Sequence, residues 1–309
     1  MLRNLFLYLS ENPRVHHAVL RSSAARRAAA RFVAGEELDG AVATVRDLNA
    51  RGMTASLDHL GEKVSDPASA QAAAGAYRRI LDEIARSHID CNISLKLTHL
   101  GLDLDARTCG RLLRDIVAAA RGHGNFVRID MESSAYVDRT LALYQGLRAD
   151  GLDNVGVVLQ SYLYRTAHDL DDLLPMAPRV RLVKGAYAEP ADVACARKAD
   201  VDAAFRRLAE RLLDAAPVPA IATHDEALIN HARAYAAARR IPPDRYEFQM
   251  LYGIRRDLQE RLVGQGFRVR VYVPFGRQWF PYFMRRLAER PANVGFVLRS
   301  LLRESLGRR

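Results

Sequence analysis

Polar side chains able to exchange protons or hydrogen bonds stand at the ends of short apolar runs along this sequence. They are Asp58 and His59, Lys96, Asp130 and Glu132, Gln160, Arg181 and Lys184, Thr223 and His224, Gln249, and Tyr272. Any one of them is explained equally well as a polar residue at the point where the chain leaves a sheet and enters solvent. Lys96 within ISLKL and Asp130 within VRIDM are more specific, because a buried charge is costly unless a partner compensates it. The pattern therefore predicts a site in which opposite charges meet.

A second candidate group lies in the last predicted helix, which begins at Trp279. Arg285 and Arg286 are adjacent, and Glu289 follows one turn later, so an arginine and a carboxylate share one helical face. A surface ion pair of this kind would contribute only roughly 0.3–0.5 kcal/mol. The aromatic run WFPYF just before the arginines argues against a fully solvated face. Two planar guanidinium groups can instead bind a carboxylate or a phosphate.

Both groups need a framework that brings distant segments together, and the sequence predicts one. Short β-branched runs alternate with longer segments rich in Ala, Leu and Arg, which indicates a parallel sheet with crossover helices. The predicted strands are 54–60, 91–97, 126–131, 155–160, 180–185, 220–224, 246–250 and 268–274. The predicted helices between them include 68–87, 106–121, 136–149, 196–215, 226–240 and 255–264. Eight such units over about 250 residues predict a closed (β/α)8 TIM-type barrel of the α/β class, with its site at the carboxyl ends of the strands.

The first fifty residues are predicted to form a helical extension that precedes a barrel domain of residues 51–309. Apolar residues recur at helical spacing between positions 38 and 48, and Gly52 can end that helix. Residues 14–32 combine Arg and Ala in a basic helix, and residues 1–9 are apolar but too short for a secretory signal. Such a segment is compatible with weak contact at a membrane surface.

The composition is that of a globular protein, and the chain is basic. It is 49% hydrophobic and 27% charged over 309 residues, and no run approaches the ~18 apolar residues of a membrane span. The net charge of +10 favours anionic partners such as a phosphate-bearing cofactor or an anionic membrane. No nucleic-acid recognition module is apparent, so nucleic acid is not an expected partner. Three cysteines without a CxxC pair indicate a reducing compartment, so we expect the cytoplasm, with contact at the cytoplasmic face of the membrane.

Sequence motifs of several other site classes are missing. The chain contains no GxGxxG, GxxxxGK[ST], HExxH or GxSxG, so a Rossmann site, a P-loop, a zincin and a serine hydrolase are not predicted. His16, His17 and His99 belong to no cluster with the spacing of metal ligands, so we expect no metal.

Nine strings of the sequence, in order, resemble motifs of the proline dehydrogenases, most closely the short monofunctional bacterial enzymes. They are SLDHLGE (56–62), ISLKLTHLGL (93–102), RIDMESS (128–134), VVLQSYLYRT (157–166), RLVKGAY (181–187), IATHD (221–225), EFQMLYGIRRDLQ (247–259), RVYVPFG (270–276) and YFMRRLAERPANVGFVLRS (282–300). The resemblance implies a distorted (β/α)8 barrel that binds FAD without a Rossmann domain. It also implies oxidation of L-proline to Δ1-pyrroline-5-carboxylate, with electrons passed from the flavin to a quinone, as the first step of proline catabolism.

The resemblance also implies roles for individual residues, motif by motif. It implies that proline is bound by Lys96, Arg285 and Arg286, which hold its carboxylate, and by Tyr187, Leu251 and Tyr272, which shape its pocket. It implies that Glu62 and Glu289 support the arginine pair, and that Glu62 can close the site. It implies that Asp130 organises the site and that Arg181 lies beside flavin N5. The flavin contacts that it implies are Met131, Gln160, Arg181, Lys184, Gly185, Ala186, Thr223 and His224.

Two other functions are compatible with parts of the pattern. A Schiff-base aldolase would use Lys96 or Lys184 at a barrel strand end as its nucleophile. A basic protein that binds nucleic acid or membrane without catalysis would use the positive charge alone.

Overall fold

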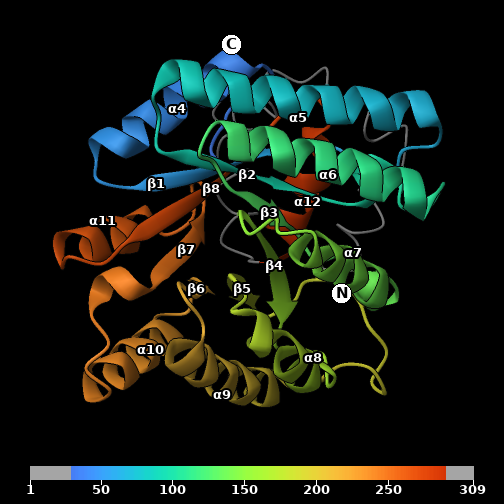
Figure 1. Ribbon diagram of the computed structural model, residues 1–309. Coiled ribbons are helices and arrows are strands. Elements are labelled where there is room, and N and C mark those ends of the chain that lie inside the picture. The colour runs from blue at the N-terminus through green and yellow to red at the C-terminus, as the bar shows by residue number, and fades with distance from the viewer. Residues whose placement is uncertain (1–28, 290–309) are drawn as a thin grey trace, which may run out of the picture.

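Eight parallel strands close into a barrel in the computed structural model, which describes residues 29–289 and the side chains through Arg286 (Figure 1). The strands are β1 (Thr54–His59), β2 (Cys91–Leu95), β3 (Val127–Ile129), β4 (Val155–Gln160), β5 (Val180–Val183), β6 (Ala220–Ala222), β7 (Glu247–Leu251) and β8 (Val269–Phe275). They pair in chain order, and β8 pairs with β1 to close the ring. The predicted (β/α)8 fold and all eight predicted strands are confirmed, although several strands are shorter than predicted.

Seven helices form the connections between successive strands around the barrel (Figure 1). They are α5 (Pro67–Ser87), α6 (Ala106–Gly122), α7 (Val137–Ala149), α8 (Thr166–Leu173), α9 (Lys198–Ala215), α10 (Glu226–Ala238) and α11 (Arg256–Gly264). Aspartate caps fix where three of them begin: Asp66 before α5, Asp105 before α6 and Asp225 before α10 each accept hydrogen bonds from the backbone of the first turn.

Helix α8 is absent from the predicted segments. Its eight residues, TAHDLDDL, include three aspartates, which are poor helix formers away from the first turn. The helix is held by tertiary packing instead, because Leu170 and Leu173 are fully buried and the Thr166 hydroxyl donates to the Gln160 carbonyl at 2.6 Å. Local sequence alone therefore does not reveal it.

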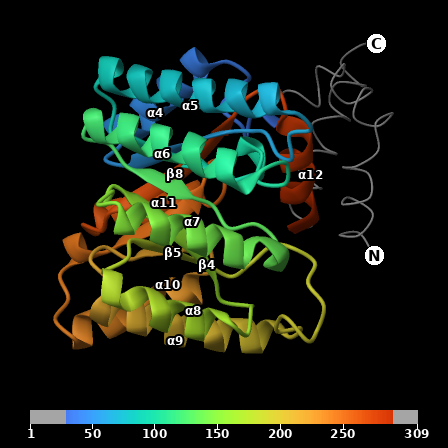
Figure 2. The same ribbon diagram turned by 45° about the vertical axis from the view of Figure 1, so that its right-hand side comes forward.

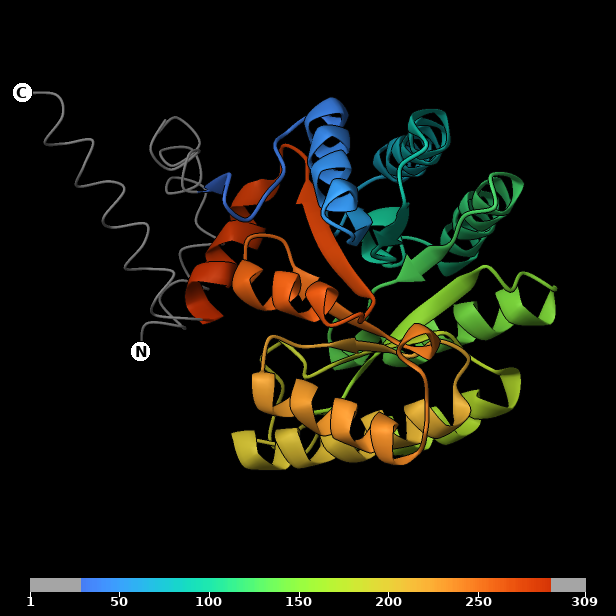
Figure 3. The same cartoon turned by 90° about the vertical axis from the view of Figure 1, so that its left-hand side faces the viewer.

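Helix α4 (Leu38–Ala50) packs against the outside of β1 and β8, and Figure 3 shows it beside β8. Its buried residues are Ala41, Val42, Val45 and Leu48, which are spaced as a single helical face. Gly52 follows with φ +76°, a conformation that glycine adopts freely. The helix predicted for this segment is confirmed, and residues 1–28 of the predicted extension lie outside the described residues.

Helix α12 (Trp279–Glu289) follows β8 but lies across one end of the barrel, apart from the ring of helices (Figure 2). Its aromatic face is buried in a second apolar cluster, separate from the main core, in which Phe32 and Leu60 also take part. The Trp279 Nε1–H also donates to Glu36 at 3.1 Å. This cluster fixes α12 at the end of the barrel, while α4 covers the wall beside β8.

The inside of the barrel is polar rather than filled with branched aliphatic residues. Arg181 on β5 donates to Ser94 on β2 and to Gln249 on β7, and these strands are not its neighbours in the sheet. Such contacts are possible only across the barrel interior. The aliphatic residues of the strands, such as Leu57 and Ile93, belong instead to the core beneath the helices. Among residues 29–289, no helix is long and apolar enough to cross a membrane.

Candidate active site

A cavity of about 680 Å³ opens at the carboxyl ends of the strands, and α12 contributes part of its wall. It is the site that the polar strand ends predict, because parallel strands deliver their last residues to one end of the barrel. The following predicted site residues line it: Lys96, Asp130, Met131, Gln160, Arg181, Lys184, Gly185, Ala186, Tyr187, Thr223, His224, Leu251, Tyr272, Arg285 and Arg286. Glu62 forms ion pairs with two of these residues, Lys96 and Arg285. The Glu289 side chain lies outside the described residues.

Asp130 links two cavity residues from distant strands. Its Oδ1 accepts from Arg181 Nη1 at 2.7 Å, and its Oδ2 accepts from the Tyr272 hydroxyl at 2.7 Å. Burial, reinforced by the nearby carboxylates Asp130 and Asp58, raises the pKa of Tyr272 well above its usual value. Tyr272 therefore remains a phenol that donates. Arg181 is buried, and its guanidinium is held in the cavity wall by Asp130.

Lys96 stands between two carboxylates. Its Nζ lies 3.4 Å from Asp58 Oδ2 and 3.8 Å from Glu62 Oε1. Burial lowers the pKa of Lys96, but the charges of Asp58, Glu62 and Asp130 outweigh burial and raise that pKa above its usual value. Lys96 is thus an ammonium ion. A Schiff-base nucleophile requires a neutral amine, so this environment argues against Lys96 as the nucleophile of an aldolase.

Arg285 and Arg286 reach the cavity from α12 and differ in their surroundings. Arg285 Nη2 forms an ion pair with Glu62 Oε1 at 2.7 Å, which joins the end of the barrel to the loop after β1. Burial raises the pKa of Glu62, but Lys96 and Arg285 outweigh burial and hold that pKa below its usual value. Arg286 is 8% exposed, and its guanidinium lies 5.0 Å from the centre of the Tyr282 ring. Lys96, Arg285 and Arg286 together form a cationic group suited to a carboxylate.

Another part of the cavity wall contains a charged side chain, Lys184, and a backbone segment at Gly185 that packs closely against Tyr162. Lys184 Nζ contacts Asp202 at 2.6 Å and Asp225 at 2.9 Å. Gly185 has φ +118°, and a Cβ atom there would lie 2.2 Å from the ring of Tyr162, so only glycine fits. His224 Nε2 accepts from the Leu251 backbone N–H at 2.9 Å, so the imidazole is neutral at that nitrogen.

Gln160 offers an acceptor that the surrounding chain leaves unused. Its Nε2 donates to the Glu132 carbonyl at 3.2 Å, whereas its buried Oε1 has no hydrogen-bond partner among the residues that the structure describes. A buried acceptor without a donor is costly, so a ligand N–H or O–H at this wall would relieve the cost. Within the described part of the chain, no group of three or more His, Cys, Asp or Glu could hold a metal ion.

Several polar cavity residues are absent from the predicted site. They are Lys198, Asp225, Glu226, Gln249, Arg255 and Tyr282. Asp225 follows Thr223 and His224 directly, so the string IATHD could have indicated it. Gln249 is among the polar strand ends noted above. Lys198 and Arg255 lie at or just before helix starts and carry no local signal that links them to a strand end.

A closed (β/α)8 barrel with a charged cavity at the carboxyl ends of its strands defines an enzyme of the TIM-barrel class. The family model for proline dehydrogenase matches residues 41–299. The chain belongs to the proline dehydrogenase family, whose members are oxidoreductases that act on a CH–NH bond. The resemblance read from the nine strings is therefore confirmed, and family and fold together support proline oxidation in proline catabolism.

Curated relatives match along almost the whole chain. Proline dehydrogenase 1 of Bacillus subtilis subsp. natto is 41% identical over 304 residues, which cover 98% of this chain and 100% of that relative. Proline dehydrogenase of Deinococcus radiodurans is 41% identical over 307 residues, which cover 98% of each chain. Among solved structures, proline utilization A (PutA) from Bdellovibrio bacteriovorus inactivated by N-propargylglycine matches with a TM-score of 0.81 and 26% identity. That match covers 85% of this chain and 32% of the PutA chain.

Proposed function

We propose that this protein oxidises L-proline to Δ1-pyrroline-5-carboxylate with bound FAD and passes the electrons to a quinone. The observation that supports the proposal most strongly is the pairing, within one cavity, of a carboxylate-binding cationic group with a separately anchored arginine. Lys96, Arg285 and Arg286 form the first, and Arg181 on its Asp130 partner forms the second. When the carboxylate of the substrate is bound, its ring is held in a fixed position away from the carboxylate, and the reaction takes place on the ring.

The residues around the cationic group have complementary roles in this proposal. Lys96, Arg285 and Arg286 bind the carboxylate of proline, and Glu62 and Glu289 balance the arginine charges. Tyr187, Leu251 and Tyr272 form the wall against the proline ring. Asp130 orients Arg181 and Tyr272 together, since each of its oxygens accepts from one of them.

The described residues fit a flavin. The cavity has a volume of about 680 Å³, and its wall contains the buried Gln160 Oε1, which accepts no hydrogen bond from the described residues, and the Gly185 backbone. Met131, Gln160, Lys184, Gly185, Ala186, Thr223 and His224 would hold the cofactor. When bound, FAD supplies the two-electron oxidation, which no protein side chain can perform. Arg181 contributes a preorganised positive charge that stabilises the negative charge of the reduced form.

The acceptor and location follow from the charge of the chain. The net charge of +10 and the apolar and basic N-terminal sequence favour peripheral contact with an anionic membrane, where quinones are dissolved. We assign the protein to the cytoplasm in contact with the inner face of that membrane.

One spectrum of the purified protein tests the proposal. We expect a yellow solution whose flavin absorbance bleaches when proline is added without oxygen, and recovers when a soluble quinone is added. A colourless protein that borohydride traps on a carbonyl substrate would support the aldolase instead. Salt-sensitive binding to nucleic acid or vesicles without turnover would instead support a basic binding protein that has no catalytic activity.

A further inference from the structure

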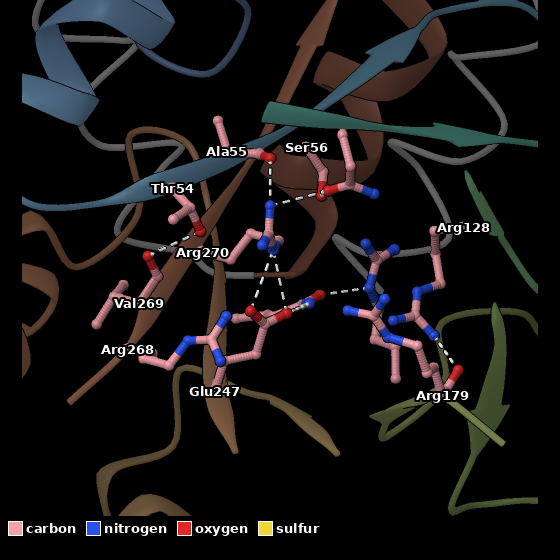
Figure 4. Close-up of polar contacts among 12 residues, drawn as sticks. Thr54, Ala55, Ser56, Arg128, Arg179, Glu247, Arg268, Val269 and Arg270 are labelled. Atoms are coloured by element: carbon pink, nitrogen blue, oxygen red, sulfur yellow. Dashed lines mark hydrogen bonds and ion pairs between the residues drawn. The ribbon is translucent and has the colours of Figure 1, made fainter. Parts of the chain in front are cut away.

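A continuous chain of buried polar contacts runs through the barrel to Arg181. Arg181 Nε donates to Gln249 Oε1 at 2.5 Å, and Gln249 Nε2 donates in turn to Glu247 Oε1. Glu247 also accepts from Arg270 Nε at 3.1 Å, and Arg270 Nη1 donates to the Ala55 carbonyl at 2.7 Å. Figure 4 shows Arg270 between the Glu247 carboxylate and Ala55. Glu247 does not line the cavity, so it cannot act on a ligand directly.

The carboxylate of Glu247 decides how the Gln249 amide is oriented. An amide presents a donor at one end and an acceptor at the other, and either orientation fits the same space. Because a carboxylate only accepts, Glu247 binds the NH2 end of Gln249 and leaves the amide oxygen facing Arg181. The reverse orientation would place two donors, the Gln249 NH2 and the Arg181 Nε–H, against each other. Glu247 therefore enforces an acceptor at Arg181 Nε without touching Arg181.

The surroundings of Glu247 keep it charged for this task. Burial raises the pKa of Glu247, but Arg270, the Gln249 amide and Arg128 outweigh burial and hold that pKa below its usual value. Arg270 is itself bound to Asn92 Oδ1 at 3.0 Å, and Ser56 donates to the same oxygen at 2.5 Å. Such a network is costly in a barrel interior that aliphatic side chains could fill, since buried ion pairs are often no more stabilising than apolar residues.

Arg181 is thereby held at all three of its guanidinium nitrogens. Asp130 binds Nη1, Ser94 accepts from Nη2 at 3.1 Å, and Gln249 binds Nε. Asp130 and Ser94 fix the outer nitrogens, and Gln249 fixes the nitrogen nearest the side-chain stem. Loss of the Nε contact would leave the guanidinium held only at Nη1 and Nη2, so that it could rotate about the line joining these two nitrogens.

We propose that Glu247 and Gln249 are positioning residues that lock the Arg181 guanidinium in the orientation that the redox reaction requires. This inference rests on the proposed function, in which Arg181 tunes the bound flavin. It assigns a role in the reaction to Glu247, which does not line the cavity, acting through Gln249, which does.

The central test replaces Gln249 by methionine, which is similar in length and leaves the formal charge unchanged. For Gln249→Met we expect kcat with proline to fall about 10- to 100-fold, because small misplacements of a positioned group are costly. The KM for proline and the affinity for tetrahydro-2-furoate should change less than about 2-fold, because the carboxylate-binding group is intact. Redox titration of the bound flavin should show a lowered potential. Arg268→Gln is the matched control, since Arg268 is exposed beside β8 and donates only to the Asp244 carbonyl at 3.0 Å among the contacts of the described chain.

A second variant separates positioning from plain electrostatics. Glu247→Leu combined with Arg270→Leu removes both buried partners, which avoids leaving one charge unpaired. The double change is neutral in net charge, so a lowered flavin potential would reflect lost positioning. In Glu247→Gln alone, loss of a negative charge acting through space would raise the potential, whereas release of Arg181 would lower it, and we expect it to fall.

The outcomes distinguish this inference from the proposed function. A wild-type protein without flavin, or without proline oxidation, would refute the proposed function first. A wild-type protein that bleaches with proline, together with a Gln249→Met variant of unchanged kcat and potential, would overturn the positioning role alone. A Gln249→Met variant that lost proline affinity and kcat equally would place Gln249 in substrate binding instead and would also overturn it.

Discussion

Replacing Arg286 by lysine is expected to weaken proline binding more than the same replacement of Arg285. Arg286 is buried, whereas the Arg285 side chain is 28% exposed. Lysine keeps the charge but loses the planar fork that binds both oxygens of a carboxylate. A buried hydrogen bond to a charged group contributes about 2–3 kcal/mol, which corresponds to roughly 30- to 150-fold in affinity. Solvent screens the interaction of the more exposed Arg285 side chain with a carboxylate, so its lysine variant should lose roughly 10-fold or less.

The assay is the steady-state KM for proline together with the inhibition constant of tetrahydro-2-furoate, which keeps the ring and the carboxylate. Both constants should rise in parallel, with flavin content and melting temperature near those of the wild type. Arg277→Lys is the control, because the Arg277 side chain is 79% exposed and pairs only with Glu37 among the described residues. An Arg286→Lys variant with an unchanged KM would refute the reasoning and return Arg286 to a structural role.

Four further predictions concern Arg181, the link between protein and flavin, membrane contact and Glu62. Arg181→Met should lower the flavin potential and slow reduction by proline while the melting temperature is retained; an unchanged potential in a redox titration would contradict this. Acid precipitation should release all the yellow colour, since FAD is expected to be bound without a covalent link; colour in the pellet would contradict that. The protein should sediment with anionic liposomes at low salt, and the bound fraction should fall as the salt concentration rises. No binding at low salt would contradict membrane contact through the positive charge. The pKa of Glu62 is lower in the folded protein than in an unfolded chain, so its charge stabilises the fold above the pKa of an unfolded glutamate, and this stabilisation is lost as pH falls through the folded pKa. The free energy of unfolding in urea should therefore fall less for Glu62→Gln than for the wild type between about pH 6 and pH 3, and an equal fall would contradict this.

The barrel was predictable because its signals are local. Most strands are short apolar runs with β-branched residues, and most carry a polar residue at or just after their last position, which closure of the sheet brings to one end of the barrel. This periodicity places Lys96, Asp130 and Arg181 in the cavity without any knowledge of their contacts. The helix α4 was predictable for the same reason, since its buried residues recur at one spacing.

The contacts between these residues were not predictable from local pattern. Arg285 and Glu62 are separated by 223 positions, and Arg181 and Gln249 by 68, so only the closed barrel and the placement of α12 bring them together. The position of α12 depends on an aromatic cluster with Phe32 and Leu60, whose parts are far apart in the sequence. Periodicity shows that a helix follows β8, and it does not show that this helix lies over the end of the barrel.

The charge states of the cavity residues bear on the pH dependence of the proposed reaction. The charges of Asp58, Glu62 and Asp130 outweigh burial and hold the pKa of Lys96 above its usual value, and the charges of Lys96 and Arg285 outweigh burial and hold the pKa of Glu62 below its usual value. Burial raises the pKa of Tyr187 and of Tyr272, so both remain phenols. Lys96, Glu62, Tyr187 and Tyr272 therefore keep one charge state near neutral pH. A rate of flavin reduction that rises with pH in this range would then report the substrate amine, which must lose its proton before hydride can leave the adjacent carbon.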